Sequence, residues 1–170
     1  MNNFKLLGLT AGVGSLVLAG SAVADFTGMQ YETVENGMAG YTTYRIYAGV
    51  DAGGELDAVY GDEANALSVS SDSGFYQDGF GGYSAPNAAL FAFFPSLEFD
   101  SFVTIGLTEG PGTGEGAINT IQDDENPWGF NFEDGQDLLI EDAIGGGWFI
   151  FNGESNGIAG EDNQVLLAQI

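Results

Sequence analysis

The sequence predicts an all-β fold, a single jelly-roll-like or immunoglobulin-like β-sandwich with short antiparallel strands and Gly-rich loops. Glycine makes up 28 of the 170 residues and falls in clusters between short apolar runs, which is the spacing of turns in β proteins. The runs themselves are rich in β-branched and aromatic residues, which favour strands. Asn-Gly and Asp-Gly pairs supply residues that tolerate a positive φ in tight turns. These pairs are Asn36-Gly37, Asp78-Gly79, Asp134-Gly135, Asn152-Gly153 and Asn156-Gly157.

Seven apolar runs are expected to form strands, and turns in the intervening segments raise the expected total to roughly eight to ten. The runs are 41–50, 56–60, 66–69, 99–107, 128–132, 148–151 and 165–170. In the run 99–107 both alternating faces are partly apolar, which is typical of a central strand between two packed layers. The one helix-like segment is Asn87 to Phe94, about two turns long, which Pro86 would begin and Pro95 would end.

Residues 1–24 have the pattern of a secretory signal peptide. A short polar start carries Lys5, an apolar stretch runs from Leu6 to Ala19, and small residues stand at Ala22 and Ala24. The alternative is a membrane anchor, but the stretch is about 14 residues long and falls short of the roughly 20 that span a bilayer. We therefore expect cleavage after Ala24, no transmembrane segment in the mature chain, and a secreted protein located extracellularly, at the cell surface or in the periplasm. Residues 25–170 are then the single β-sandwich domain.

The charge balance excludes several classes of function. Asp and Glu number 25 against 2 Lys and Arg, so the chain repels nucleic-acid phosphates. Cys and His are absent, which excludes disulfides, thiolate or imidazole metal sites and the usual Ser–His or Cys nucleophiles. Removal of residues 1–24 takes away Lys5, so the mature charge is 1 − 25 = −24 and Arg45 is the remaining cation.

Several segments together resemble a known type of domain. They are 44–48, 58–62, 67–69, 74–77, 97–106 and 156–162, which mix turn glycines with core aromatics. On these segments the chain resembles an acidic, Gly- and aromatic-rich domain that recurs in secreted proteins of marine microbes. The resemblance carries no known activity with it. In that domain another strand or two follows the segment like Leu166 to Ile170, which implies an unfilled sheet edge here.

Carboxylates are the abundant reactive groups, so the alternative function is a small carboxylate-dependent secreted hydrolase of glycosidase type. The candidates are Glu98 with Asp100, and the cluster Glu133, Asp134, Asp137, Glu141 and Asp142. Because carboxylates occur about every six residues, such pairs arise by chance in a solvated acidic surface. We therefore expect no catalytic residues.

The segment 152–163 is the sharpest candidate for a Ca²⁺ site, because hard cations prefer oxygen ligands. The predicted ligands are Asn152, Glu154, Asn156 and Asp162, with Gly157 at the sixth position of the loop. Asn163 replaces the bidentate Glu expected at position twelve, so a plain pair of Asn-Gly turns is the alternative. The segment 123–126 is a second candidate cation loop. No other cofactor is expected.

Arg45 is expected to form a largely buried structural salt bridge or to stack on a tyrosine, and the alternative is that it recognises an anionic ligand. Trp128, Trp148, Tyr76 and Tyr83 are candidates for a sugar-stacking platform, although core packing is the better interpretation for Trp148. We therefore predict a non-catalytic module at the cell surface or in the extracellular matrix. It would bind polysaccharide, or assemble with copies of itself or other surface proteins, with Ca²⁺ as the candidate cofactor.

Overall fold

The computed structural model describes residues 26–170, which form a mostly β fold with nine strands, one α-helix and three short 3₁₀ helices. The predicted signal peptide, residues 1–24, lies outside the described residues. The elements in chain order are β1 (Phe26–Val34), β2 (Thr43–Val50), β3 (Ala58–Gly61), β4 (Leu67–Val69), η1 (Ala88–Leu90), η2 (Pro95–Phe99), β5 (Phe102–Val103), β6 (Asn119–Ile121), α1 (Trp128–Glu133), β7 (Leu138–Ile140), β8 (Gly146–Phe149), η3 (Ser155–Gly157) and β9 (Gln164–Gln169).

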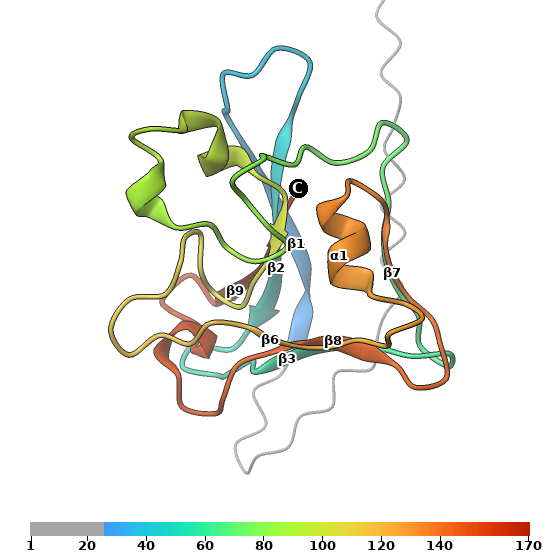
Figure 1. Cartoon of the computed structure of the whole chain (residues 1–170). Coiled ribbons are helices and arrows are strands. Elements are labelled where there is room, and N and C mark those ends of the chain that lie inside the picture. Colours follow the sequence, from blue (N-terminus) through green and yellow to red (C-terminus); the bar gives the residue numbers. More distant parts are fainter. Residues whose placement is uncertain (1–25) are drawn as a thin grey trace, which may run out of the picture.

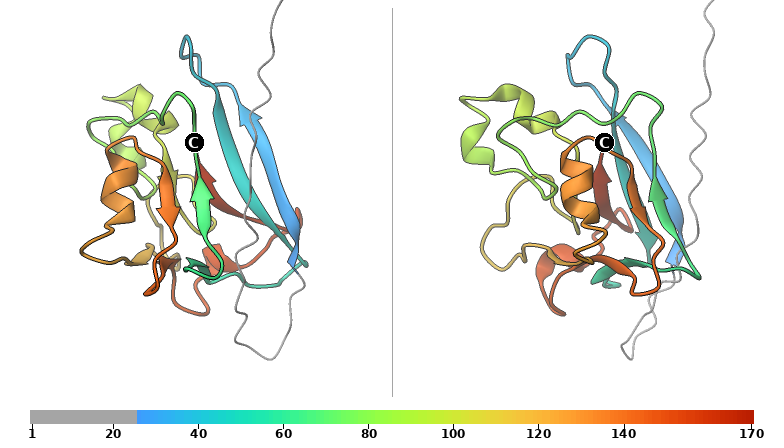
Figure 2. Two further views of the ribbon diagram at one scale, coloured as in Figure 1. Left: turned by 90° about the vertical axis from the view of Figure 1, so that its right-hand side faces the viewer. Right: turned by 45° about the vertical axis from the view of Figure 1, so that its right-hand side comes forward.

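The strands form three sheets, and every strand pair is antiparallel (Figure 1). The first sheet has the order β1-β2-β9-β5, the second β3-β8-β6, and the third β4-β7. Figure 2 shows β1 and β2 as a long hairpin with β1 outermost. The prediction of a mostly β fold with antiparallel strands is confirmed, and the number of strands lies within the expected range.

The prediction of a strand at 128–132 is wrong, because this segment is the helix α1. Trp128 and Phe132 stand four residues apart, so a helix places both on one face, and both are buried. Asp134-Gly135 ends the helix, with Gly135 at a φ of 80°. The aromatic character of the run favoured a strand, but burial of one helical face decides the structure.

Two further segments differ from expectation. The helix expected over Asn87 to Phe94 is reduced to the single turn η1, where the Asn87 side chain accepts a hydrogen bond from the Ala89 N–H at 2.9 Å. Pro95 does not merely end a helix, because it begins η2. Of the run 99–107, only β5 is a regular strand, since residues up to Phe99 belong to η2.

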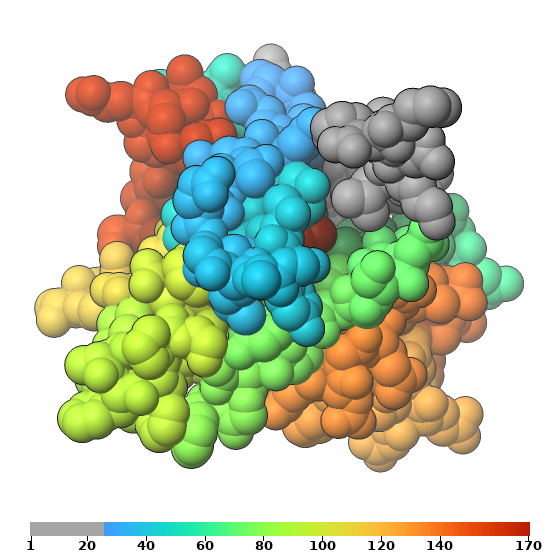
Figure 3. All heavy atoms as spheres, turned by 90° about the horizontal axis from the view of Figure 1, so that it is seen from above, coloured from blue at the N-terminus to red at the C-terminus, as the bar shows by residue number. Residues whose placement is uncertain are grey.

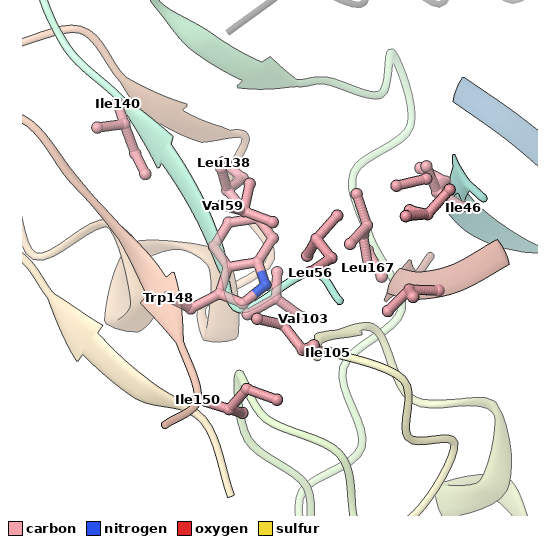
Figure 4. Close-up of a cluster of buried hydrophobic side chains, with 14 of the residues drawn as sticks. Ile46, Leu56, Val59, Val103, Ile105, Leu138, Ile140, Trp148, Ile150 and Leu167 are labelled. Carbon is pink, nitrogen blue, oxygen red and sulfur yellow. The ribbon is translucent and has the colours of Figure 1, made fainter. Parts of the chain in front are cut away.

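The core is a cluster of buried aliphatic side chains around two tryptophans. Figure 4 shows the Trp148 indole among Val59, Leu138 and Val103. Its Nε1–H donates to the Thr104 carbonyl at 2.8 Å, and the Trp128 Nε1–H donates to Ile121 at 2.9 Å. Both indoles are therefore satisfied inside the protein, so the suggestion that they stack on sugars is wrong. None of the helices between residues 26 and 170 has the length and apolar character that a membrane crossing requires.

Candidate functional site

The segment between Asp78 and Asp100 leaves the body of the protein and returns to it, and we call residues 79–99 the aromatic loop. At its base the Val103 N–H donates to the Tyr83 carbonyl at 2.9 Å, and Ser84 and Val103 form a parallel bridge. The loop contains η1 and η2 and projects to one side of the sheets (Figure 1). Seen from above, it forms a distinct lobe of the surface beside the turn between β1 and β2 (Figure 3).

The tip of the aromatic loop is apolar and exposed. Phe93 has 75% of its surface exposed, and Phe80, also exposed, stacks on Phe94 with ring centroids 3.8 Å apart. Residues 87–97 contain no charged side chain, in a chain with 25 carboxylates. Backbone groups of the tip pair with one another: the Leu90 N–H donates to the Asn87 carbonyl, and the Phe94 N–H donates to the Leu90 carbonyl. Exposed phenylalanine side chains on a projecting loop make this tip a candidate contact site.

A buried carboxylate holds the two ends of the aromatic loop together. Asp100 is fully buried, and its two oxygens accept the backbone N–H groups of Asp78 at 2.7 Å and Gly82 at 3.3 Å. The chain wraps closely around this carboxylate, since a Cβ at Gly81 would lie well inside the van der Waals contact distance of one of its oxygens. Burial raises the pKa of Asp100 to about 6, although the Asp78 and Gly82 N–H donors oppose the shift.

Asp78 fixes the loop from its other end. Its carboxylate accepts hydrogen bonds from the Ser96 hydroxyl at 2.7 Å, the Tyr76 hydroxyl at 3.1 Å and the Phe80 N–H at 3.0 Å. Burial tends to raise the pKa of Asp78, but the three donors outweigh it and the pKa lies below its ordinary value. The exposed phenylalanines Phe80 and Phe93 are therefore carried by a loop that is fixed at Asp78, Ser96 and Asp100.

Gln169 on β9 joins the aromatic loop to the four-stranded sheet. Its Nε2 donates to the carbonyls of Glu98 at 2.9 Å and Asp100 at 3.0 Å, while its Oε1 accepts a hydrogen bond from the Arg45 Nε at 3.1 Å. Arg45 also lies 3.8 Å from the Glu32 carboxylate, so the expected salt bridge is present. The expectation that the pair is largely buried is wrong, because 51% of the Glu32 side chain is exposed.

The carboxylates considered for hydrolysis hold the structure in place. Asp100 is enclosed, whereas Glu98 is exposed, so they do not face a common space. In the 133–142 cluster, Asp137 accepts the Ser71 N–H at 3.2 Å. Asp142 accepts the N–H groups of Ile144 and Gly145, and these donors together with Asn126 hold its pKa below the ordinary value. Asp142 therefore holds a local turn, whereas Asp137 joins two segments that are 66 residues apart in the sequence.

The four predicted calcium ligands have different partners. Asn156 is a buried bridge, with its Oδ1 accepting the Gly116 N–H at 2.8 Å and its Nδ2 donating to Ile105 at 2.7 Å and Gly116 at 3.1 Å. Glu154 accepts the Phe151 N–H at 3.1 Å. Asp162 accepts the Gln164 amide at 3.3 Å and lines a hollow of ≈ 320 Å³ beside Asn156.

Asn152 instead contacts two carboxylates that the sequence analysis did not select. Its Nδ2 lies 3.0 Å from Glu55 and 3.4 Å from Asp57. Burial raises the pKa of Asp57, the Asn152 hydrogen bond opposes this, and the charges of Glu55 and Glu154 add to the rise. Across residues 26–170, however, no group of three or more acidic side chains is placed to hold a metal ion.

The sequence pattern did not identify the aromatic loop as a site, although one signal was present. The run from Asn87 to Leu97 is long and uncharged in an otherwise acidic chain, but its residues predict a short helix and do not show that it is exposed. Comparison of the chain with protein-family models, with curated proteins and with solved structures finds no match, so a proposal for its function rests on the geometry of the molecule.

Proposed function

We propose that this chain is a secreted, non-catalytic β-sandwich module of the cell surface or extracellular matrix, and that it binds another surface protein through the aromatic loop. The observation that carries the proposal is the exposure of two phenylalanines, Phe80 and Phe93, on a loop fixed by the buried Asp100. Ordering a loop on binding costs conformational entropy. This loop is already ordered in the free protein, so binding does not carry that cost. A preorganised phenyl surface favours association.

The chemistry of the loop favours a protein partner over a polysaccharide. A sugar ring that stacks on phenyl groups also presents hydroxyls, which need hydrogen-bond partners once buried. Within residues 87–97 the polar side chains are Asn87 and Ser96. Asn87 caps the Ala89 N–H, and Ser96 donates to Asp78. Apolar side chains of a partner protein need no such groups and fit this surface better.

Binding to the cells that produce the protein tests the proposal. The full chain is expressed, recovered after export and labelled, and the variants Phe93→Ser and Phe80→Ser are compared with Phe151→Ser. Phe151 is a matched control, because 63% of its surface is exposed and it lies outside the loop. Circular dichroism confirms that each variant is folded.

We expect wild type and Phe151→Ser to bind the cells equally, and both loop variants to lose most of the binding. Protease treatment of the cells should abolish binding, and polysaccharide purified from the same cells should retain none of the protein. Loop variants that bind like wild type would show that the loop is not the contact surface. Retention on the purified polysaccharide would replace the protein partner with a carbohydrate.

A further inference from the structure

The outer edge of β1 is unpaired by any residue in the range 26–170. Tyr44 on β2 exchanges two backbone hydrogen bonds with Ile170, at 2.6 and 2.8 Å, so the backbone groups of even-numbered β2 residues face β9. Odd-numbered β2 residues consequently face β1, where Arg45 is opposite Glu32 and Tyr47 is opposite Gln30. Within the regular stretch from Gly28 to Val34, the N–H and C=O groups of the alternate β1 residues point to the open edge. These residues are Met29, Tyr31 and Thr33.

This edge has few of the features that usually prevent strands from pairing with other chains. Proline, lysine and inward-pointing charges are the common protections, and β1 contains none of them. A bulge between Phe26 and Gly28 disturbs one end, but pairing with β2 is regular from Gly28 to Val34. Met29 and Tyr31 are both exposed, Tyr31 over 65% of its surface. The strand therefore presents both backbone groups and apolar side chains to a partner.

The charges on and beside β1 favour a second copy of this chain as the partner. Glu32 is the one charged residue of β1, and its carboxylate lies 3.8 Å from Arg45 and accepts the Tyr47 hydroxyl at 2.5 Å. Arg45 is also the one Lys or Arg between residues 26 and 170. The single cation of this part of the chain thus neutralises the single charge on the open strand. Two copies that repel each other elsewhere can approach here without adding like-charge repulsion.

We propose that β1 is a homodimerisation edge, at which two copies pair their β1 strands antiparallel about a two-fold axis. The product is one continuous sheet with β1 and its symmetry mate in the centre. Centring the pair on Gln30 places Met29 opposite the partner's Tyr31, a favourable thioether–aromatic contact, and Glu32 opposite Gly28. The paired residues Met29 and Tyr31 both offer outward backbone groups, as a hydrogen-bonded antiparallel pair requires.

A single pair of strands buries less than the roughly 1,600 Å² of a standard interface, so the dimer is expected to be weak. The test is sedimentation velocity of the exported protein from about 10 to 500 µM, a range that covers such affinities. Tyr31→Pro removes an outward N–H and leaves the bonds to β2 in place. Tyr31→Thr is the matched control, because it removes the ring and keeps the N–H.

We expect a monomer–dimer equilibrium for wild type and Tyr31→Thr, and a folded monomer for Tyr31→Pro. A wild-type protein that stays monomeric, or a folded Tyr31→Pro that dimerises like wild type, would overturn the proposal. Phe93→Ser should dimerise normally, because the aromatic loop is a separate surface. Dimerisation lost in Phe93→Ser and kept in Tyr31→Pro would place the interface on that loop instead.

A second pair of variants tests the electrostatic step and does not depend on proline. Arg45→Gln removes the cation that neutralises Glu32, so β1 carries one uncompensated negative charge. The double variant Arg45→Gln with Glu32→Gln also lacks the arginine, but its β1 strand is neutral. At about 20 mM NaCl, where screening is weak, the single variant should dimerise more weakly than the double variant. The difference should fade at about 500 mM NaCl. Equal dimerisation of the two variants at low salt would refute the charge argument.

Discussion

Replacement of Asp100 by Asn should change how stability depends on pH. Burial raises the pKa of Asp100 from 3.8 to about 6 in the folded protein, so the folded state binds this proton more tightly than the unfolded state does. The free energy of unfolding therefore falls as the pH rises from 3.8 to about 6, and is constant for this group above that range. A shift of about two units corresponds to about 3 kcal/mol.

The amide introduced by Asp100→Asn stays neutral at every pH, so the variant's free energy of unfolding does not fall in this way as the pH rises. Its oxygen can accept the shorter hydrogen bond, from the Asp78 N–H at 2.7 Å, while its NH₂ group would face the Gly82 N–H less favourably. The weaker contact with the Gly82 N–H lowers the variant's free energy of unfolding by the same amount at every pH. The informative quantity is the variant's free energy of unfolding minus that of wild type, which should grow by about 3 kcal/mol between about pH 3 and pH 7.

Urea unfolding followed by tryptophan fluorescence measures this difference, because Trp128 and Trp148 are both buried. Removing any carboxylate also reduces the overall repulsion of an acidic chain. Glu98→Gln controls for that effect, since Glu98 is exposed and two residues away. The Asp100→Asn difference should change with pH far more than the Glu98→Gln difference. Parallel pH profiles for the two variants would refute the reasoning.

Three more substitutions or conditions test other parts of the structure. Arg45→Ala should lower the free energy of unfolding by about 1 to 3 kcal/mol, because it leaves the buried Gln169 oxygen without a donor, and an unchanged urea midpoint would contradict this. Gly81→Ala should lower the melting temperature by several degrees, whereas Gly79→Ala should not, because nothing lies within 4 Å of a Cβ at Gly79. If Ca²⁺ binds beside Asn152, millimolar CaCl₂ in about 0.5 M NaCl should raise the melting temperature more than MgCl₂ does, and Asp57→Asn should remove this gain. Equal effects of the two salts would show that this segment forms turns and no Ca²⁺ site.

Six of the nine strands overlap runs predicted from the sequence, because glycine clusters and β-branched runs act locally, but β1, β6 and β7 were not predicted. β2 and β9 lie within one or two residues of their predicted ranges. The helix α1 could not be predicted in this way, because its aromatic residues favour a strand locally and only the burial of Trp128 and Phe132 together selects the helix.

The candidate site was harder to predict than the fold. An apolar run such as 88–94 is usually buried, so its exposure in the aromatic loop depends on the whole structure. Asp100 was considered beside Glu98 as a reactive pair, but alternation along the chain does not show which carboxylate is enclosed. Its role depends on Asp78 and Gly82, which approach it only when the loop closes.

The position of β9 between β2 and β5 has a consequence for the order of folding. The chain is synthesised from its amino end, so β1 and β2 are complete long before β9 is made, and any hairpin that they form meanwhile has a second open edge, on β2. The pairs between β2 and β9, such as Ala48 with Val165, join residues more than a hundred positions apart, and such long-range pairing is slow. The sheet therefore closes only after residues 164–169 have been made. A nascent chain that stops before Gln164 cannot complete the sheet, and it leaves a hairpin that can be extended by other strands from both sides.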